Sequence, residues 1–136
     1  MKGLIFTLSA GLILAGLITL AALESGGVVK IATTNPANGE ERLTHIWFIE
    51  ADDDAGPLHL EAGHPGNPWV EDLRVHPYAT IDGKPYQFVL PSAGQEADTH
   101  EHIRFEMRRK YGWRDVWVGL LFDTSQSFMI EAHPQS

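Results

Sequence analysis

The apolar positions of this chain divide into one long uninterrupted run and a series of short segments. Between Gly3 and Leu23 no residue is charged, and the only polar side chains are Thr7, Ser9 and Thr19. About 20 apolar residues suffice to cross a bilayer as a helix, whereas a buried core helix would show a polar face. The run therefore predicts a single-pass transmembrane anchor over residues 3–23. A secretory signal peptide, cleaved near Thr19-Leu20-Ala21, is the alternative.

This run divides the chain into an N-terminal segment, residues 1–25, and one domain, residues 26–136. Lys2 precedes the run and Glu24 follows it, so the positive-inside rule places the N-terminus in the cytoplasm and the domain outside. Lys30 lies close on the other side and leaves the side of the membrane open. The sequence therefore predicts a membrane protein whose orientation is undecided.

Short β-branched or alternating segments predict the strands of the domain. They are bounded by turn-forming residues, among them Asp52–Pro57 and the dipeptide Asp82-Gly83, which favours a hairpin. The predicted strands are Val28–Thr33, Leu43–Ile49, Leu58–Ala62, Tyr78–Ile81, Tyr86–Leu90 and Ser127–Glu131.

The second and third of these strands also predict a register. The segment 43–49 is apolar on both faces, so we expect it to be central in the sheet. If it pairs with 58–62 through the intervening turn, three pairs share the inner face: Ile49 with Leu58, Trp47 with Leu60, and His45 with Ala62. A slip of one residue would reverse every assignment.

Helical periodicity is confined to two places in the domain. Trp69–Val75 predicts a short helix that ends at His76-Pro77. Asp98–Tyr111 predicts the main helix, capped by Asp98, with Ile103, Met107 and Tyr111 as its buried stripe. Six short strands with few helices favour a mainly β, α+β fold closed into a small barrel; an open sheet is the alternative.

Composition excludes several functions. The 136 residues carry a net charge of −8, which disfavours binding to nucleic acid or to an anionic lipid surface. Without cysteine, the chain has no disulfide, thiolate zinc site or cysteine nucleophile.

The motifs of common catalytic sites are also missing, so we assign no catalytic residue. No Gly-x-Ser-x-Gly, Walker or Gly-x-Gly-x-x-Gly motif occurs. Of the seven histidines, His100 and His102 fall about 200° apart around one helix, and no metal-ligand spacing appears, so no metal site is predicted. Trp69 follows a Gly/Pro loop at the end of a strand, where barrels place ligand contacts. The residues alone thus predict a small barrel with a pocket for a planar ligand.

Several short motifs in order give this pattern a more specific meaning. They lie in Arg42–Phe48, Leu60–Gly63, Asn67–Leu73 and Lys110–Asp115, with matching positions at Thr33-Thr34 and Pro77. Over residues 28 to 131 the chain resembles the deazaflavin (F420)-dependent nitroreductase family of the flavin/deazaflavin oxidoreductases. The resemblance implies a split β-barrel, similar to FMN-binding proteins.

The resemblance also implies a cofactor site. The cofactor would be F420, with FMN as the alternative. Arg42 would approach its anionic side chain and Trp69 would wall its ring, while the remaining cofactor-binding residues would be Thr44, His45, Ala62, Gly63 and His64. The chain departs from the family in having Asp72 and His76 where Asn is usual, and no basic residue between positions 35 and 39. These departures leave haem, another hydrophobic ligand or no cofactor open.

Two functions follow from the resemblance and the N-terminal run. The first is a membrane-anchored oxidoreductase that transfers hydride from a reduced deazaflavin or flavin to a lipophilic acceptor, such as a quinone or a nitroaromatic compound. The second is a non-catalytic barrel that binds a flavin, haem or other hydrophobic ligand at the membrane. A homodimer is compatible with either function.

Overall fold

The computed structural model describes residues 2–24, 27–50 and 56–136. Most of the expected turn at 52–57, and part of the linker after residue 24, lie outside these residues. The elements in order are α1 Lys2–Glu24, β1 Val29–Thr34, β2 Glu41–Ile46, β3 Phe48–Ile49, β4 Leu58–Ala62, α2 Pro68–Val75, β5 Tyr78–Ile81, β6 Lys84–Val89, the 3-10 turn η1 Glu96–Thr99, α3 His100–Tyr111, α4 Trp113–Leu121 and β7 Phe128–Pro134.

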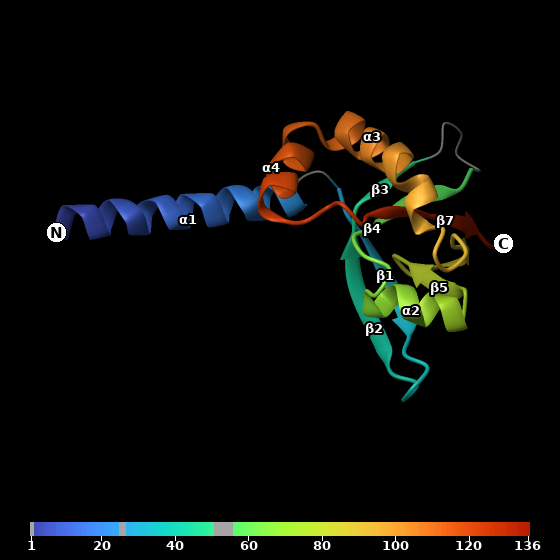
Figure 1. Cartoon of the computed structure of the whole chain (residues 1–136). Helices are drawn as coiled ribbons and strands as arrows, with labels where there is room; N and C mark the ends of the chain where they lie inside the picture. Colours follow the sequence, from blue (N-terminus) through green and yellow to red (C-terminus); the bar gives the residue numbers. More distant parts are fainter. Residues whose placement is uncertain (1, 25–26, 51–55) are drawn as a thin grey trace.

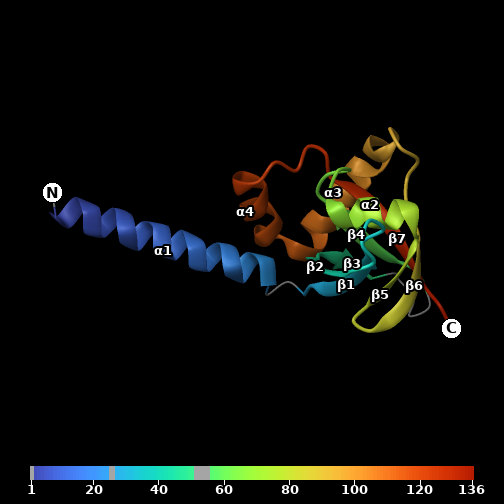
Figure 2. The same cartoon turned by 90° about the horizontal axis from the view of Figure 1, so that it is seen from below.

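The described strands form one antiparallel sheet in the order β2-β1-β5-β6-β7-β4-β3. Its two end strands, β2 and β3, are separated in sequence only by Trp47, so the sheet must curl until its ends meet. At that point the backbone N–H of Glu61 donates a hydrogen bond to the carbonyl of Trp47 at 3.3 Å. The curled sheet is visible in Figure 1 and Figure 2. The predicted barrel-like closure is confirmed.

The expected central strand at 43–49 is wrong. It is split at Trp47 into β2 and β3, which lie at opposite ends of the sheet. The register is also shifted by one residue, because Phe48 lies opposite Leu60 and Ile49 opposite His59. At the break, the side chain of Trp47 stacks on Tyr111 with ring centroids 4.2 Å apart and belongs to a core cluster separate from that of the barrel.

The hairpin and the first helix of the domain agree with the sequence. Asp82 and Gly83 both have positive φ, 49° and 81°, as the tight turn between β5 and β6 requires. The short helix α2 begins one residue before Trp69 and ends at Val75. Its Trp69, Val70 and Leu73 side chains are buried against the sheet.

The predicted stripe of α3 is confirmed. Ile103, Met107 and Tyr111 are buried and form a second core cluster with Trp47, outside the barrel. The Tyr111 hydroxyl donates to the carbonyl of Gly27 at 2.9 Å, and burial raises its pKa to about 12. The expected cap is wrong: α3 starts at His100, after a 3-10 turn that contains Asp98, and none of the side chains that the structure describes caps it.

The apolar run after Trp113, to which the sequence assigned no element, forms α4. This helix lies beside the C-terminal end of α1, which projects away from the barrel in Figure 1 and Figure 2. The indole N–H of Trp117 donates to the Thr19 hydroxyl at 2.9 Å, and that of Trp47 donates to the carbonyl of Leu23 at 3.0 Å. The segment expected to cross the membrane is thus helical. Within the described part of the chain, however, no helix combines the length and apolar character needed for a membrane span.

Candidate functional site

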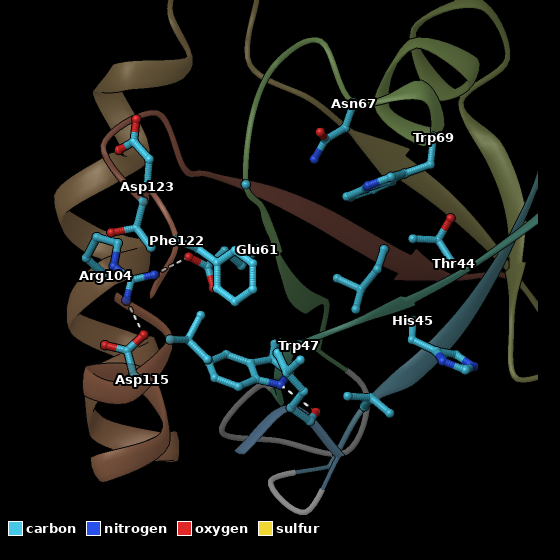
Figure 3. Close-up of a pocket in the computed structure, with 16 residues that line it drawn as sticks. Thr44, His45, Trp47, Glu61, Asn67, Trp69, Arg104, Asp115, Phe122 and Asp123 are labelled. Atoms are coloured by element: carbon cyan, nitrogen blue, oxygen red, sulfur yellow. Dashed lines mark hydrogen bonds and ion pairs between the residues drawn. The ribbon is translucent and has the colours of Figure 1, made fainter. Parts of the chain in front are cut away.

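A cavity of about 420 Å³ lies where the sheet closes, between the barrel, the loop before α2, and α4. Its walls come from segments far apart in sequence, as Figure 3 shows. The apolar side includes Leu23, Val28, Ile46, Val118 and Phe122, and the polar side includes Thr44, Asn67, Asp123 and Thr124. This volume is within the range of pockets that hold small organic ligands.

Two indoles wall the cavity. Trp69 is 5% exposed and comes from the first turn of α2, and Trp47 is 9% exposed and comes from the break between β2 and β3. Stacking on Tyr111 and the hydrogen bond to Leu23 hold the Trp47 ring in place. Gly63 also belongs to the lining and contributes no side chain. Flat rings beside a glycine backbone suit a planar aromatic ligand.

The polar floor of the cavity is an ionic cluster. The guanidinium of Arg104 bridges the carboxylates of Glu61 and Asp115, and Arg108 Nε contacts Asp115 at 3.1 Å. Asp115 is 1% exposed and Glu61 is 12% exposed. The cluster ties β4 to α3 and α4, and Figure 3 shows it beside Trp47.

Burial and ion pairing shift the pKa values of Glu61 and Arg104 in this cluster. Desolvation raises the pKa of Glu61 above its usual 4.5, although Arg104 opposes the shift. For Arg104, burial acts to lower the pKa, but the two carboxylates outweigh it and raise the pKa above its usual value. The cavity therefore holds a permanently charged guanidinium beside a carboxyl group that protonates more readily than an exposed one.

The lining over the described residues includes four of the seven cofactor-binding residues expected from the sequence: Thr44, His45, Gly63 and Trp69. Thr44 is half-buried, whereas His45 is exposed on the alternate face of β2. Ala62 is fully buried in the barrel core, and the Nδ1 atom of His64 accepts a hydrogen bond from the backbone of Gly66 at 2.9 Å.

Arg42 is engaged elsewhere. Its Nε donates to the buried carboxylate of Asp72 at 2.9 Å, and the Thr33 hydroxyl donates to the same oxygen at 2.8 Å. Asp72 stands where the family usually has Asn, so the departure noted in the sequence supplies the ion-pair partner. Arg42 thus ties β2 to α2.

The ionic cluster was missed by sequence reasoning. Glu61 lies in an alternating strand and reads as a solvent-facing position, because its apolar neighbours Leu60 and Ala62 face the core. The available signal was the spacing of Arg104 and Arg108, one helical turn apart, before an isolated acidic residue at 115. That signal resembles an ordinary exposed salt bridge.

The cavity fits one part of the expected cofactor and not another. A lining that includes two indoles suits the ring portion of a flavin or deazaflavin. A phosphate does not fit, since the lining holds the carboxylates of Glu61, Asp115 and Asp123 and only one guanidinium, which is already paired. The phosphate-bearing side chain would have to be held outside the cavity.

No family model matches this chain, and a search of the curated proteins found no similar one. Similarity to solved structures is clear. An F420 reductase aligns with 85% of this chain and 92% of its own at a TM-score of 0.55 and 12% identity. An FMN-binding protein related to pyridoxamine 5'-phosphate oxidase, from Nostoc punctiforme, aligns over 92% and 78% at a TM-score of 0.54 and 14% identity.

A third structure, described as a candidate pyridoxamine 5'-phosphate oxidase from Listeria innocua, aligns over 90% of this chain and 94% of its own, with a TM-score of 0.51 and 17% identity. At such identities the similarity establishes the fold. The split β-barrel expected from the motifs is confirmed as the fold.

Proposed function

We propose that the chain is a split-barrel oxidoreductase that binds the ring of a flavin or deazaflavin in the cavity between Trp47 and Trp69. The observation that carries the proposal is this cavity of about 420 Å³, whose lining includes the indoles of Trp47 and Trp69. The fold supports it, because an F420 reductase and an FMN-binding protein share the same architecture.

When bound, the cofactor would supply hydride transfer, and the protein would supply position and electrostatics. Trp47, Trp69 and Phe122 would exclude water from the ring. Arg104 would hold the Glu61 carboxyl group in a fixed position at the floor of the cavity. Gly63 leaves room for a ring to approach the backbone.

The finer assignment follows the sequence resemblance. F420 is the first candidate and FMN the second, and the acceptor is a quinone-like or nitroaromatic compound. The apolar wall formed by Leu23, Val118 and Phe122 supports a lipophilic acceptor. Attachment to a membrane through residues 3–23 remains part of this proposal, supported by the exposed apolar side chains of α1.

Titration of the full chain with F420 and with FMN, side by side, tests the proposal. Loss of an aromatic wall costs about 1–3 kcal/mol of stacking energy, so Trp69→Ala should weaken binding of the preferred cofactor about 5- to 150-fold. Trp113→Ala is the matched control, since Trp113 is 53% exposed and is not among the lining residues. If neither cofactor binds, or if both variants bind equally, the redox proposal fails.

The acidic lining favours a second candidate, a non-catalytic carrier of an uncharged hydrophobic ligand. Three carboxylates against one guanidinium repel phosphate but tolerate a neutral ring. Binding of haem or a quinone, together with no binding of FMN or F420 in the same titration, would select this function.

A further inference from the structure

Helix α4 buries an acidic residue and exposes several apolar ones. Its acidic residue, Asp115, is 1% exposed and faces Arg104. Its apolar residues Trp113, Val116 and Leu120 follow i, i+3, i+7 spacing and are 53%, 42% and 75% exposed. A surface helix of a water-soluble domain normally shows the opposite arrangement, with its apolar stripe toward the core.

The outward stripe of α4 adjoins a second apolar surface. α4 packs beside the C-terminal end of α1, as Figure 1 and Figure 2 show, and the Trp117–Thr19 hydrogen bond fixes the contact. Large side chains are exposed along α1, among them Leu12, Ile13, Leu14 and Leu17 at 76%, 64%, 58% and 59%. No charged residue occurs between positions 3 and 23.

The distribution of apolar side chains on α1 favours lipid over a protein partner. A protein partner covers one face of a helix, whereas lipid at a membrane surface can contact every exposed side of it. Because α1 is apolar on every side, lipid covers its exposed side chains more completely than a single protein groove does. The net charge of −8 indicates that the attraction is apolar and does not require anionic lipid.

The cavity reaches the same surface. Phe122, the residue that follows α4, lines the cavity and is still 53% exposed, so it lies at the rim. Leu23 from the last turn of α1 and Val118 from α4 line the cavity behind it. Both α1 and α4 therefore supply residues to the cavity lining and to the exposed apolar surface.

We propose that α4, through Trp113, Val116 and Leu120, is a second lipid-contacting element beside α1, and that the cavity is entered from this lipid-facing side past Phe122. The class of ligand that follows is a ring compound dissolved in the lipid phase. That last step rests on the proposed function, whereas the lipid contact of α4 does not.

Quenching by brominated lipid tests the contact with the full chain reconstituted in zwitterionic phosphatidylcholine vesicles. Bromine on the acyl chains should quench Trp113, so Trp113→Phe should remove most of the quenching. The matched variant Trp69→Phe should retain it, because Trp69 is 5% exposed. Equal quenching in the two variants, or none in the wild type, would overturn the proposal.

A charge substitution tests the same face while α1 is left intact. Val116→Lys with Leu120→Lys should abolish the quenching of Trp113. Leu43→Lys, at an apolar side chain on β2 that is 58% exposed, should leave it unchanged. If the wild-type chain instead stays free of vesicles and forms a dimer that the α4 double variant breaks, the occupant is a second copy and the lipid proposal is wrong.

Entry from the lipid side is measured with two quinones, menadione added to the solution and a long-chain ubiquinone dissolved in the vesicles. Both should quench Trp69 in the wild type, and the α4 double variant should lose only the response to the long-chain ubiquinone. Equal loss of both responses would overturn entry from the lipid side. If neither quinone quenches Trp69 but bromolipid still quenches Trp113, entry from the lipid side is overturned and the lipid contact of α4 stands.

Discussion

At the scale of single residues, the floor of the cavity is made of charged side chains that are largely buried. Glu61 and Asp115 share Arg104, and both carboxylates are largely buried. A buried ion pair costs desolvation energy that its attraction only partly offsets, so such clusters serve position more than stability. Here the cluster joins β4, α3 and α4 beneath the two indoles.

Glu61 should make the stability of the protein depend on pH. Its pKa is raised in the folded state by burial, so the folded chain binds a proton more tightly than the unfolded chain. The stability that this proton contributes is fully present below the unfolded pKa, near 4.5, and is lost as the pH rises through the folded pKa.

Glu61→Gln removes this titration. Urea unfolding of both proteins from pH 4 upward should show the wild type losing stability relative to the variant as pH rises. Parallel stability curves for the two proteins would show that Glu61 does not titrate differently on folding.

Substitutions in the Arg42–Asp72 ion pair should affect the stability of the fold and not the binding of a ligand in the cavity. Asp72→Ala leaves Arg42 and the Thr33 hydroxyl without their acceptor, and we expect a loss of about 2–4 kcal/mol in the free energy of unfolding. Glu71→Ala, on the exposed face of the same helix, should change it by no more than about 0.5 kcal/mol.

Arg42→Ala should lower stability while leaving the affinity of the cavity for its ring ligand unchanged, because Arg42 is not among the lining residues. Isothermal titration and urea unfolding on the same preparation separate the two effects. A fall in affinity of tenfold or more, with stability preserved, would show that Arg42 takes part in ligand binding.

At the scale of elements, the turn between α3 and α4 carries a specific backbone demand. Gly112 has φ 55° and ψ −120°, a backbone conformation that is unfavourable for every residue except glycine. Gly119 lies inside α4, and a Cβ at either glycine would meet no atom within 4 Å. The two positions therefore differ in backbone conformation and not in available space.

Gly112→Ala should cost about 1–3 kcal/mol of stability, and Gly119→Ala should add up to about 1 kcal/mol. Thermal unfolding of the two variants measures the difference. Equal effects of the two substitutions would mean that the turn at Gly112 relaxes without strain.

The helices and strands also show which features local sequence patterns can predict and which they cannot. The hairpin at Asp82-Gly83 and the α3 stripe depend on neighbours in the chain, and both were predicted. The break at Trp47 depends on Tyr111, 64 positions later, and no local pattern contains it. The sequence assigned no element to the segment that forms α4, whose exposed Trp113, Val116 and Leu120 depart from the usual pattern of an apolar stripe that faces the core.

For the whole molecule, the closure of the sheet positions the site. Because β2 and β3 end the sheet on either side of Trp47, the indole stands where the barrel closes, and Trp69 stands beside it on α2. Motif order predicted this fold and placed Thr44, Gly63 and Trp69 in positions that line the cavity. It could not supply the ionic floor, whose members come from β4, α3 and α4.

The central claim is that a planar ring binds between these two indoles. Electron density from crystals of the full chain grown with F420 or FMN tests it most directly. We expect flat density in the cavity, in contact with Trp69 and Trp47 and near the Glu61 carboxyl group. A bound ring located outside the cavity, or a cavity filled by the Phe122 side chain, would contradict the account.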